Sequence, residues 1–200
     1  MMIGKLSSKI SDLLIRKSVI DSEDQELYVY GFFMLLSQLL YLIITCIFGL
    51  LFQCFLESVI FYFAFQLIRK YAGGYHASTE GRCEIMTTLS ILACIVMIWL
   101  SRSYEFSLLL FCISLVAVLV IAVLCPLDTP EKPLSNKELK YFRKISWLIL
   151  FIIATLIDVS YIFEWSYIFS PCCMSLILES ILIIAGKIKQ ITNIKKMKSK

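Results

Sequence analysis

The chain has 200 residues, of which 60% are hydrophobic and only 17% are charged, and its formal net charge is +4. With a mean hydropathy of +0.85, this composition leaves too little polar surface for a water-soluble globular protein, and it indicates an integral membrane protein. We predict an all-α fold with about six transmembrane helices, each near the roughly 20 residues that cross about 30 Å of hydrocarbon.

The N-terminal segment is amphipathic rather than apolar, because its hydrophobic residues recur at helical spacing among charged ones. This pattern predicts a helix lying in the membrane interface, and it argues against a removable signal peptide. One membrane domain, 1–200, is expected, consisting of the interfacial segment 1–26, transmembrane helices within 27–186 and a basic tail at 187–200. The spans are predicted at 27–49, 54–68, 83–100, 106–125, 145–162 and 166–186.

Lys and Arg residues are distributed unevenly among the connecting segments. Eighteen lie in the N-terminal segment, the loop around residue 76, the loop before the fifth span and the tail, whereas the other loops together contain only Arg102. Positive residues in short loops stay on the cytoplasmic side. We therefore predict that both termini and the loop at 69–83 are cytoplasmic.

That loop contains the only histidine, His76, with Cys83 seven residues later. A thiolate is the reactive form of cysteine, and a neighbouring imidazole or a helix N-terminus favours its formation. On one continuous helix the two residues would stand about 10.5 Å apart, so we expect the segment to fold back, and Gly73 and Gly74 allow the required backbone angles. These residues alone indicate a membrane thiol hydrolase or acyl transferase. The alternative is an ordinary loop in which the histidine and cysteine are incidental.

The other seven cysteines are interpreted as structural. A single histidine, with no CxxC pair or HExxH pattern, disfavours a zinc site, and no metal or cofactor is expected. Three carboxylates, Glu57, Asp158 and Glu179, fall in or near predicted spans. We expect all three to lie close to the outer ends of their spans, where they reach water.

The run from Arg69 to Ala77, followed by Cys83, resembles the signature of the accessory gene regulator protein B (AgrB) family. These are membrane peptidases that mature cyclic autoinducing peptides in Gram-positive quorum sensing. The segment 125–133 resembles the later cytoplasmic loop of that family. The resemblance implies a bacterial cell membrane, a possible homodimer, and a site in which Cys83 is the nucleophile and His76 its base.

The resemblance further implies that Arg69 supports this site, together with Gly73 and Gly74. The partner would be an AgrD-like propeptide with an amphipathic leader, a central thiol or hydroxyl and an acidic tail, and no nucleic acid is involved. Cys83 would attack the bond before the tail and hold the remainder as a thioester. The internal thiol or hydroxyl of the propeptide would then close a thiolactone or lactone ring.

The basic loop 126–144 suggests how the acidic tail is bound. Our hypothesis is that its cations attract the tail together with Lys70 or Arg82. The candidate substrate-binding residues are Lys70, Arg82, Asp128, Lys132 and Lys137. Alternatively the cations only meet anionic membrane lipid, and Asp128 caps a turn before Pro130.

A different class of function also fits a small membrane protein of this kind. A peptide exporter or transporter would move the signal without cutting it, and Cys83 would then be dispensable. Against this alternative, ionisable residues are sparse within the predicted spans. A structural partner of a sensor kinase would give no reason for the Gly-Gly-x-His segment.

Overall fold

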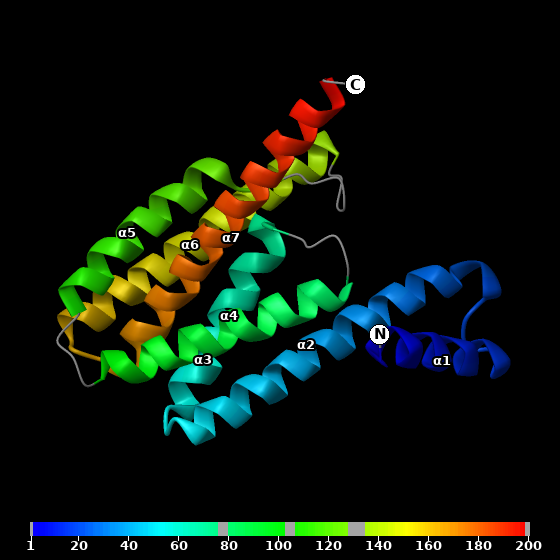
Figure 1. The fold of residues 1–200 in the computed structure, drawn as a ribbon, viewed down its shortest axis with the longest axis horizontal. Coiled ribbons are helices and arrows are strands. Elements are labelled where there is room, and N and C mark those ends of the chain that lie inside the picture. The colour runs from blue at the N-terminus through cyan, green and yellow to red at the C-terminus, as the bar shows by residue number, and fades with distance from the viewer. Residues whose placement is uncertain (1, 76–79, 103–106, 128–134, 199–200) are drawn as a thin grey trace.

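The computed structural model describes residues 2–75, 80–102, 107–127 and 135–198, and every regular element within them is a helix (Figure 1). In chain order the elements are α1 (Met2–Arg16), η1 (Ser22–Asp24), α2 (Gln25–Leu51), α3 (Phe55–Ala72), α4 (Glu80–Ser101), α5 (Ser107–Leu124), α6 (Asn136–Ile162) and α7 (Ser166–Lys198). Among the described residues, α2 with η1, α4, α5, α6 and α7 are long and apolar enough to cross a membrane. The all-α membrane fold is therefore confirmed.

Helix α3 is the remaining long helix of the bundle. It is not among the five membrane candidates because its 18 residues include Glu57, Arg69 and Lys70. These charges lie near its two ends, and its middle is apolar. The helix packs against α2, α6 and α7, so it lies inside the bundle with the apolar helices.

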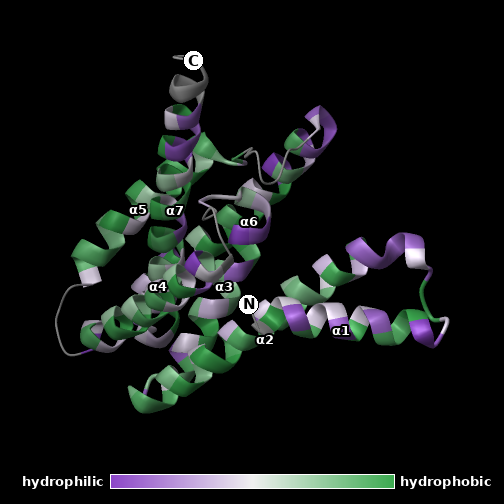
Figure 2. Cartoon of the chain, turned by 45° about the vertical axis from the view of Figure 1, so that its right-hand side comes forward, coloured by the Kyte–Doolittle hydropathy of each residue, from purple (hydrophilic) through white to green (hydrophobic). Residues whose placement is uncertain are grey.

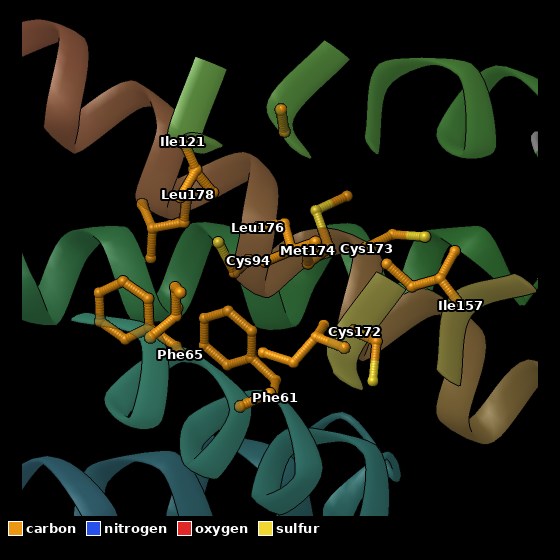
Figure 3. Close-up of a cluster of buried hydrophobic side chains, with 14 of the residues drawn as sticks. Phe61, Phe65, Cys94, Ile121, Ile157, Cys172, Cys173, Met174, Leu176 and Leu178 are labelled. Carbon is orange, nitrogen blue, oxygen red and sulfur yellow. The ribbon is translucent and has the colours of Figure 1, made fainter. Parts of the chain in front are cut away.

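Helix α7 lies at the centre of the bundle. Of its most apolar stretch, 67% is buried, against 17–28% for the other four candidate spans, and it packs against α3, α4, α5 and α6. Figure 3 shows Phe61 and Phe65 of α3, Cys94 of α4, Ile121 of α5 and Ile157 of α6 gathered around residues 172–178 of α7. The outer helix faces carry exposed apolar side chains such as Phe151 and Val123, as expected for a surface that meets lipid.

Helices α1 and α2 form an arm that extends from the bundle (Figure 1). The two helices are held together near their connection, where Gln25 Nε2 donates to Asp12 Oδ1 at 2.8 Å. Hydrophilic and hydrophobic residues alternate along α1 (Figure 2), which confirms the predicted amphipathic helix. Its location in the membrane interface stays a prediction.

The predicted span boundaries lie close to the helix ends for the first four spans, and for the end of the fifth and the start of the sixth, whereas the helices extend beyond the other two boundaries. Helix α6 begins at Asn136 rather than near 145, because Ser135 and Glu138 form a capping box that starts the helix in the polar segment. Helix α7 continues to Lys198 through most of what was predicted as a separate tail. In both cases a helix extends beyond the apolar stretch from which its span was predicted.

The carboxylates of the spans do not all lie where the sequence suggested. Glu57 is buried and pairs with Arg102, which also donates to the carbonyl oxygen of Gln53 at 2.7 Å. Asp158 is exposed. The expectation for Glu179 was wrong: its side chain is fully buried beside Arg69, at the end of α3 that leads into the Gly73–Gly74 segment. Helix packing, which a span prediction does not include, brings it there.

Candidate active site

Cys83 lies in the first turn of α4, which begins at Glu80. Its side chain is half-buried and its thiol is free. The partial positive charge of a helix N-terminus favours an anion at this position. His76 lies outside the described residues, so its pairing with Cys83 stays a prediction.

The other cysteines differ from Cys83 in their surroundings. Cys125, directly after α5, is fully buried, and this burial raises the pKa of its thiol above the ordinary value. A thiol with a raised pKa is a poor nucleophile at neutral pH. Cys112 is exposed, but it lies within the apolar span α5. Neither position competes with Cys83 as a reactive thiol.

Tyr41 of α2 is a polar group close to Cys83 that sequence reasoning missed. Its hydroxyl interacts with the side chain of Thr87, and the phenol lies within electrostatic reach of Cys83 and Glu84. One carboxylate oxygen of Glu84 is buried and has no hydrogen-bond partner among the described residues. Tyr41 falls within a long apolar run, so only the packing of α2 against α4 reveals it.

A second tyrosine extends this polar cluster between α2 and α3. The Tyr62 hydroxyl donates to the carbonyl oxygen of Gln38 at 2.6 Å and accepts from Gln66 Nε2 at 3.1 Å. Tyr62 is 4% exposed, and it also interacts with Tyr41. Tyr41 thus connects the surroundings of Cys83 to a group of hydrogen-bonding side chains within otherwise apolar helices.

The Gly-Gly segment makes a tight turn directly after α3. Gly73 has φ +79° and Gly74 has φ +135°, conformations that are easily reached only by glycine. The amide of Gly73 donates to the carbonyl oxygen of Arg69, and the amide of Leu127 donates to that of Ala72 at 2.9 Å. The segment that follows α5 thus holds the end of α3. The positive φ angles of Gly73 and Gly74 are the unusual backbone angles that the sequence predicted for them.

Arg69 lies inside this turn. Its Nη1 donates to the carbonyl oxygen of Gly73 at 2.7 Å, and its Nη2 donates to that of Tyr75 at 2.6 Å. The same Nη1 lies 3.8 Å from Oε2 of Glu179 in α7. A Cβ at Gly74 would stand 1.8 Å from Nη1. The backbone of this turn therefore curves around the guanidinium, and a glycine at position 74 leaves room for that group.

Helix α7 holds the other side of the turn. The amide of Tyr75 donates to the carbonyl oxygen of Leu182 at 2.9 Å. A Cβ at Gly186 would lie 2.5 Å from Leu127 and 2.9 Å from the nitrogen of Tyr75. This glycine allows three segments to meet: the turn, the chain after α5, and α7. The sequence gives no sign of this role, because Gly186 is far from the motif.

Side chains of one helix, α6, line an open groove of about 440 Å³, whose surface consists mostly of their carbon atoms. Its lining residues are Lys140, Tyr141, Arg143, Lys144 and Trp147. The indole of Trp147 donates to the carbonyl oxygen of Ala122 at 3.2 Å, which fixes one wall. The groove offers positive charge and aromatic surface to an anionic ligand.

The predicted substrate-binding residues are only partly described. Lys70 lies over the ring of Tyr71, 5.3 Å from its centroid, and that ring packs on Phe142 of α6, which brings Lys70 toward this helix. Arg82 and Lys137 are exposed. Asp128 and Lys132 lie outside the described residues. Among those described, no three His, Cys, Asp or Glu side chains are grouped so as to hold a metal ion.

Comparison with known proteins gives a consistent result. The profile of the family Accessory gene regulator B matches residues 7–183. An AgrB-like protein of Clostridium perfringens strain SM101 is 34% identical over 158 residues, covering 74% of this chain and 72% of that protein. An accessory gene regulator protein B of Staphylococcus intermedius is 30% identical over 112 residues, 56% of this chain and 57% of its own. No solved structure matches the chain.

Proposed function

Because the chain belongs to the accessory gene regulator B family, whose members take part in autoinducing-peptide processing, we propose that it is a membrane cysteine peptidase. It cleaves the acidic tail from a short propeptide and helps to close the remainder into a ring. Cys83 is the nucleophile and His76 is the general base. The observation that carries this proposal is the turn at 73–75, which Arg69 and α7 hold in place immediately before His76.

The reaction has two acyl transfers. In the first, the imidazole of His76 takes the proton of Cys83, and the thiolate attacks the carbonyl carbon before the acidic tail. The peptide C–N bond breaks, the proton passes from the imidazole to the leaving amine, and the propeptide stays bound as a thioester. In the second, a thiol or hydroxyl within the propeptide gives its proton to His76 and attacks the thioester carbonyl. The bond to Cys83 breaks, and the ring closes as a thiolactone or lactone.

Ring closure requires that water does not reach the thioester first. The half-burial of Cys83 at the junction of α2 and α4 supports this requirement. The hydroxyl of Tyr41, within electrostatic reach of Cys83, is a candidate hydrogen-bond donor to the carbonyl oxygen that gains negative charge. A site in open solvent would favour hydrolysis and a linear product.

We propose that the substrate binds with its amphipathic leader along the membrane and its acidic tail at the start of α6. The groove formed by Lys140, Arg143 and Lys144 complements the charge of such a tail. Lys70 lies close to the same helix through its neighbour Tyr71. The distribution of Lys and Arg residues favours a cytoplasmic position for this end of the bundle, with α3 as a sixth crossing.

The decisive experiment uses the full chain reconstituted in lipid with a propeptide of this kind. Mass spectrometry should detect a covalent adduct on Cys83 and release of the tail. Cys83→Ala should abolish both, and His76→Ala should slow adduct formation. The control is Cys112→Ala, which removes an exposed cysteine from α5 and should leave both signals intact. Transport of uncut peptide by the Cys83→Ala variant would instead support an exporter.

A further inference from the structure

Glu179 is a fully buried carboxylate in the middle of α7. Neither of its oxygens has a hydrogen-bond partner among the described residues. The one charged group that reaches it there is the guanidinium of Arg69, with Nη1 at 3.8 Å from Oε2. A buried carboxylate is costly unless an opposite charge compensates it, so this position requires an explanation.

Arg69 in turn connects the carboxylate to the candidate active site. Its side chain is 18% exposed, and two of its nitrogens donate to the carbonyl oxygens of Gly73 and Tyr75. The carbonyl of Tyr75 and the amide nitrogen of His76 belong to one planar peptide unit. Fixing the orientation of that carbonyl therefore also fixes the orientation of the backbone at the start of His76.

We propose that Glu179 is a positioning residue for the peptidase site: its carboxylate holds the Arg69 guanidinium against the carbonyls of Gly73 and Tyr75 and so fixes the turn that precedes His76. The proposal rests on the proposed function for its kinetic consequence. Its structural part, the dependence of the turn on a carboxylate in α7, stands independently of the reaction.

The distance indicates that charge matters here more than a direct hydrogen bond. At 3.8 Å the carboxylate is beyond good hydrogen-bonding range of Nη1, but an ion pair at this distance remains strong where water is scarce. Without the negative charge, the partly buried guanidinium lowers its free energy by turning toward water. It then releases the two carbonyls that it holds. Gln at position 179 preserves the size of the side chain and removes only the charge.

The chain provides a matched control at the opposite end of α3. Glu57 is also buried, and it also pairs with an arginine, Arg102, that donates to a backbone carbonyl. That pair joins the beginning of α3 to the end of α4, away from the Gly73–Gly74 turn. Glu57→Gln therefore removes the same kind of interaction without affecting the turn.

The first measurement is hydrogen–deuterium exchange of the full chain in lipid nanodiscs. In Glu179→Gln the amide of Tyr75, which donates to Leu182, should exchange roughly tenfold faster than in the wild type. Exchange of the α3 and α7 interiors should stay unchanged. Glu57→Gln should leave the Tyr75 amide unaffected. Glu179→Asp, which keeps the charge on a shorter side chain, should recover part of the protection.

The second measurement is single-turnover release of the propeptide tail. Glu179→Gln should lower the rate at saturating substrate by roughly tenfold or more while leaving the substrate dissociation constant near the wild-type value. Glu179→Asp should again be intermediate. Glu57→Gln should match the wild type.

Three results would overturn the proposal. The first is unchanged Tyr75 exchange in Glu179→Gln, and the second is faster exchange with an unchanged single-turnover rate. The third is faster exchange throughout α3 and α7, with no recovery in Glu179→Asp, which would show that the carboxylate serves only general stability. If the wild type itself releases no tail, the proposed function fails, whereas the exchange comparison still decides whether Glu179 holds the turn.

Discussion

The backbone amide of Tyr75 donates a 2.9 Å hydrogen bond to the carbonyl oxygen of Leu182. This bond joins the residue before His76 to the most buried helix of the bundle. Arg69 holds the carbonyl of the same residue from the other side. A short loop segment is thus positioned by α3 and α7 together, which is how a loop can hold a reacting group as firmly as a helix does.

Gly74 should not tolerate a side chain. In Gly74→Ala the new Cβ would stand 1.8 Å from Arg69 Nη1, at a φ of +135° that alanine rarely adopts. Because the guanidinium must move, we expect tail release to fall by roughly a hundredfold, measured by mass spectrometry in single turnover. Gly31→Ala is the control, since nothing lies within 4 Å of a Cβ there. Equal rates for the two variants would contradict the close fit of the turn.

Lysine should not replace arginine at position 69. Arg69→Lys keeps the positive charge but loses the planar fork whose two nitrogens reach Gly73 and Tyr75. We expect the single-turnover rate to fall by roughly tenfold. Arg16→Lys, at the exposed end of α1, should have no effect. A fully active Arg69→Lys would show that charge alone supports the site.

The groove on α6 should affect substrate binding rather than the rate of the chemical step. The double variant Lys140→Glu and Lys144→Glu reverses two charges in its lining, and we expect the KM for a propeptide with an acidic tail to rise several-fold at low salt. The rise should shrink at high salt, because screening weakens exposed charges.

Two controls accompany the groove experiment. Lys5→Glu with Lys9→Glu makes the same charge change on α1 and should leave KM unchanged. A propeptide whose tail carboxylates are replaced by amides should bind the wild type and the groove variant alike. An effect that does not depend on salt or on the charge of the tail would refute electrostatic capture.

Tyr41→Phe tests the hydroxyl that lies within electrostatic reach of Cys83. The change removes the group that interacts with Thr87 and lies near Cys83, and leaves the ring in place. We expect a decrease of roughly tenfold in the rate of adduct formation, measured by rapid quench and mass spectrometry. Tyr30→Phe on the exposed face of α2 is the matched control. Unchanged adduct formation would remove Tyr41 from the site.

The sequence alone predicted the helices well where an apolar run and a helix coincide. The ends of α2, α3, α4 and α5 follow the apolar runs closely. Helix α6 was predicted too short, although Ser135 and Glu138 carry the spacing of a capping box. That signal was present, but it lay in a segment interpreted as a loop.

The candidate site was predictable only where its residues are close together in the chain. Arg69, Gly73 and Gly74 lie within one short segment, and the structure places them in one turn. Glu179 and Gly186 contact the same turn, and Tyr41 lies near Cys83, but they come from helices that are distant in the chain from the motif. Which face of a helix meets which neighbour depends on side-chain packing, and the hydrophobic pattern of a single chain does not determine it.

The position of α7 in the chain has a consequence for biosynthesis. This helix supplies the Leu182 carbonyl and the Glu179 carboxylate to the turn, and it follows the other described helices in the chain. A nascent chain that has already inserted its earlier helices contains His76 and Cys83, but it lacks the two α7 groups that contact the turn before His76. The turn before His76 would therefore acquire its full set of contacts only after α7 has been synthesised and has packed against α3.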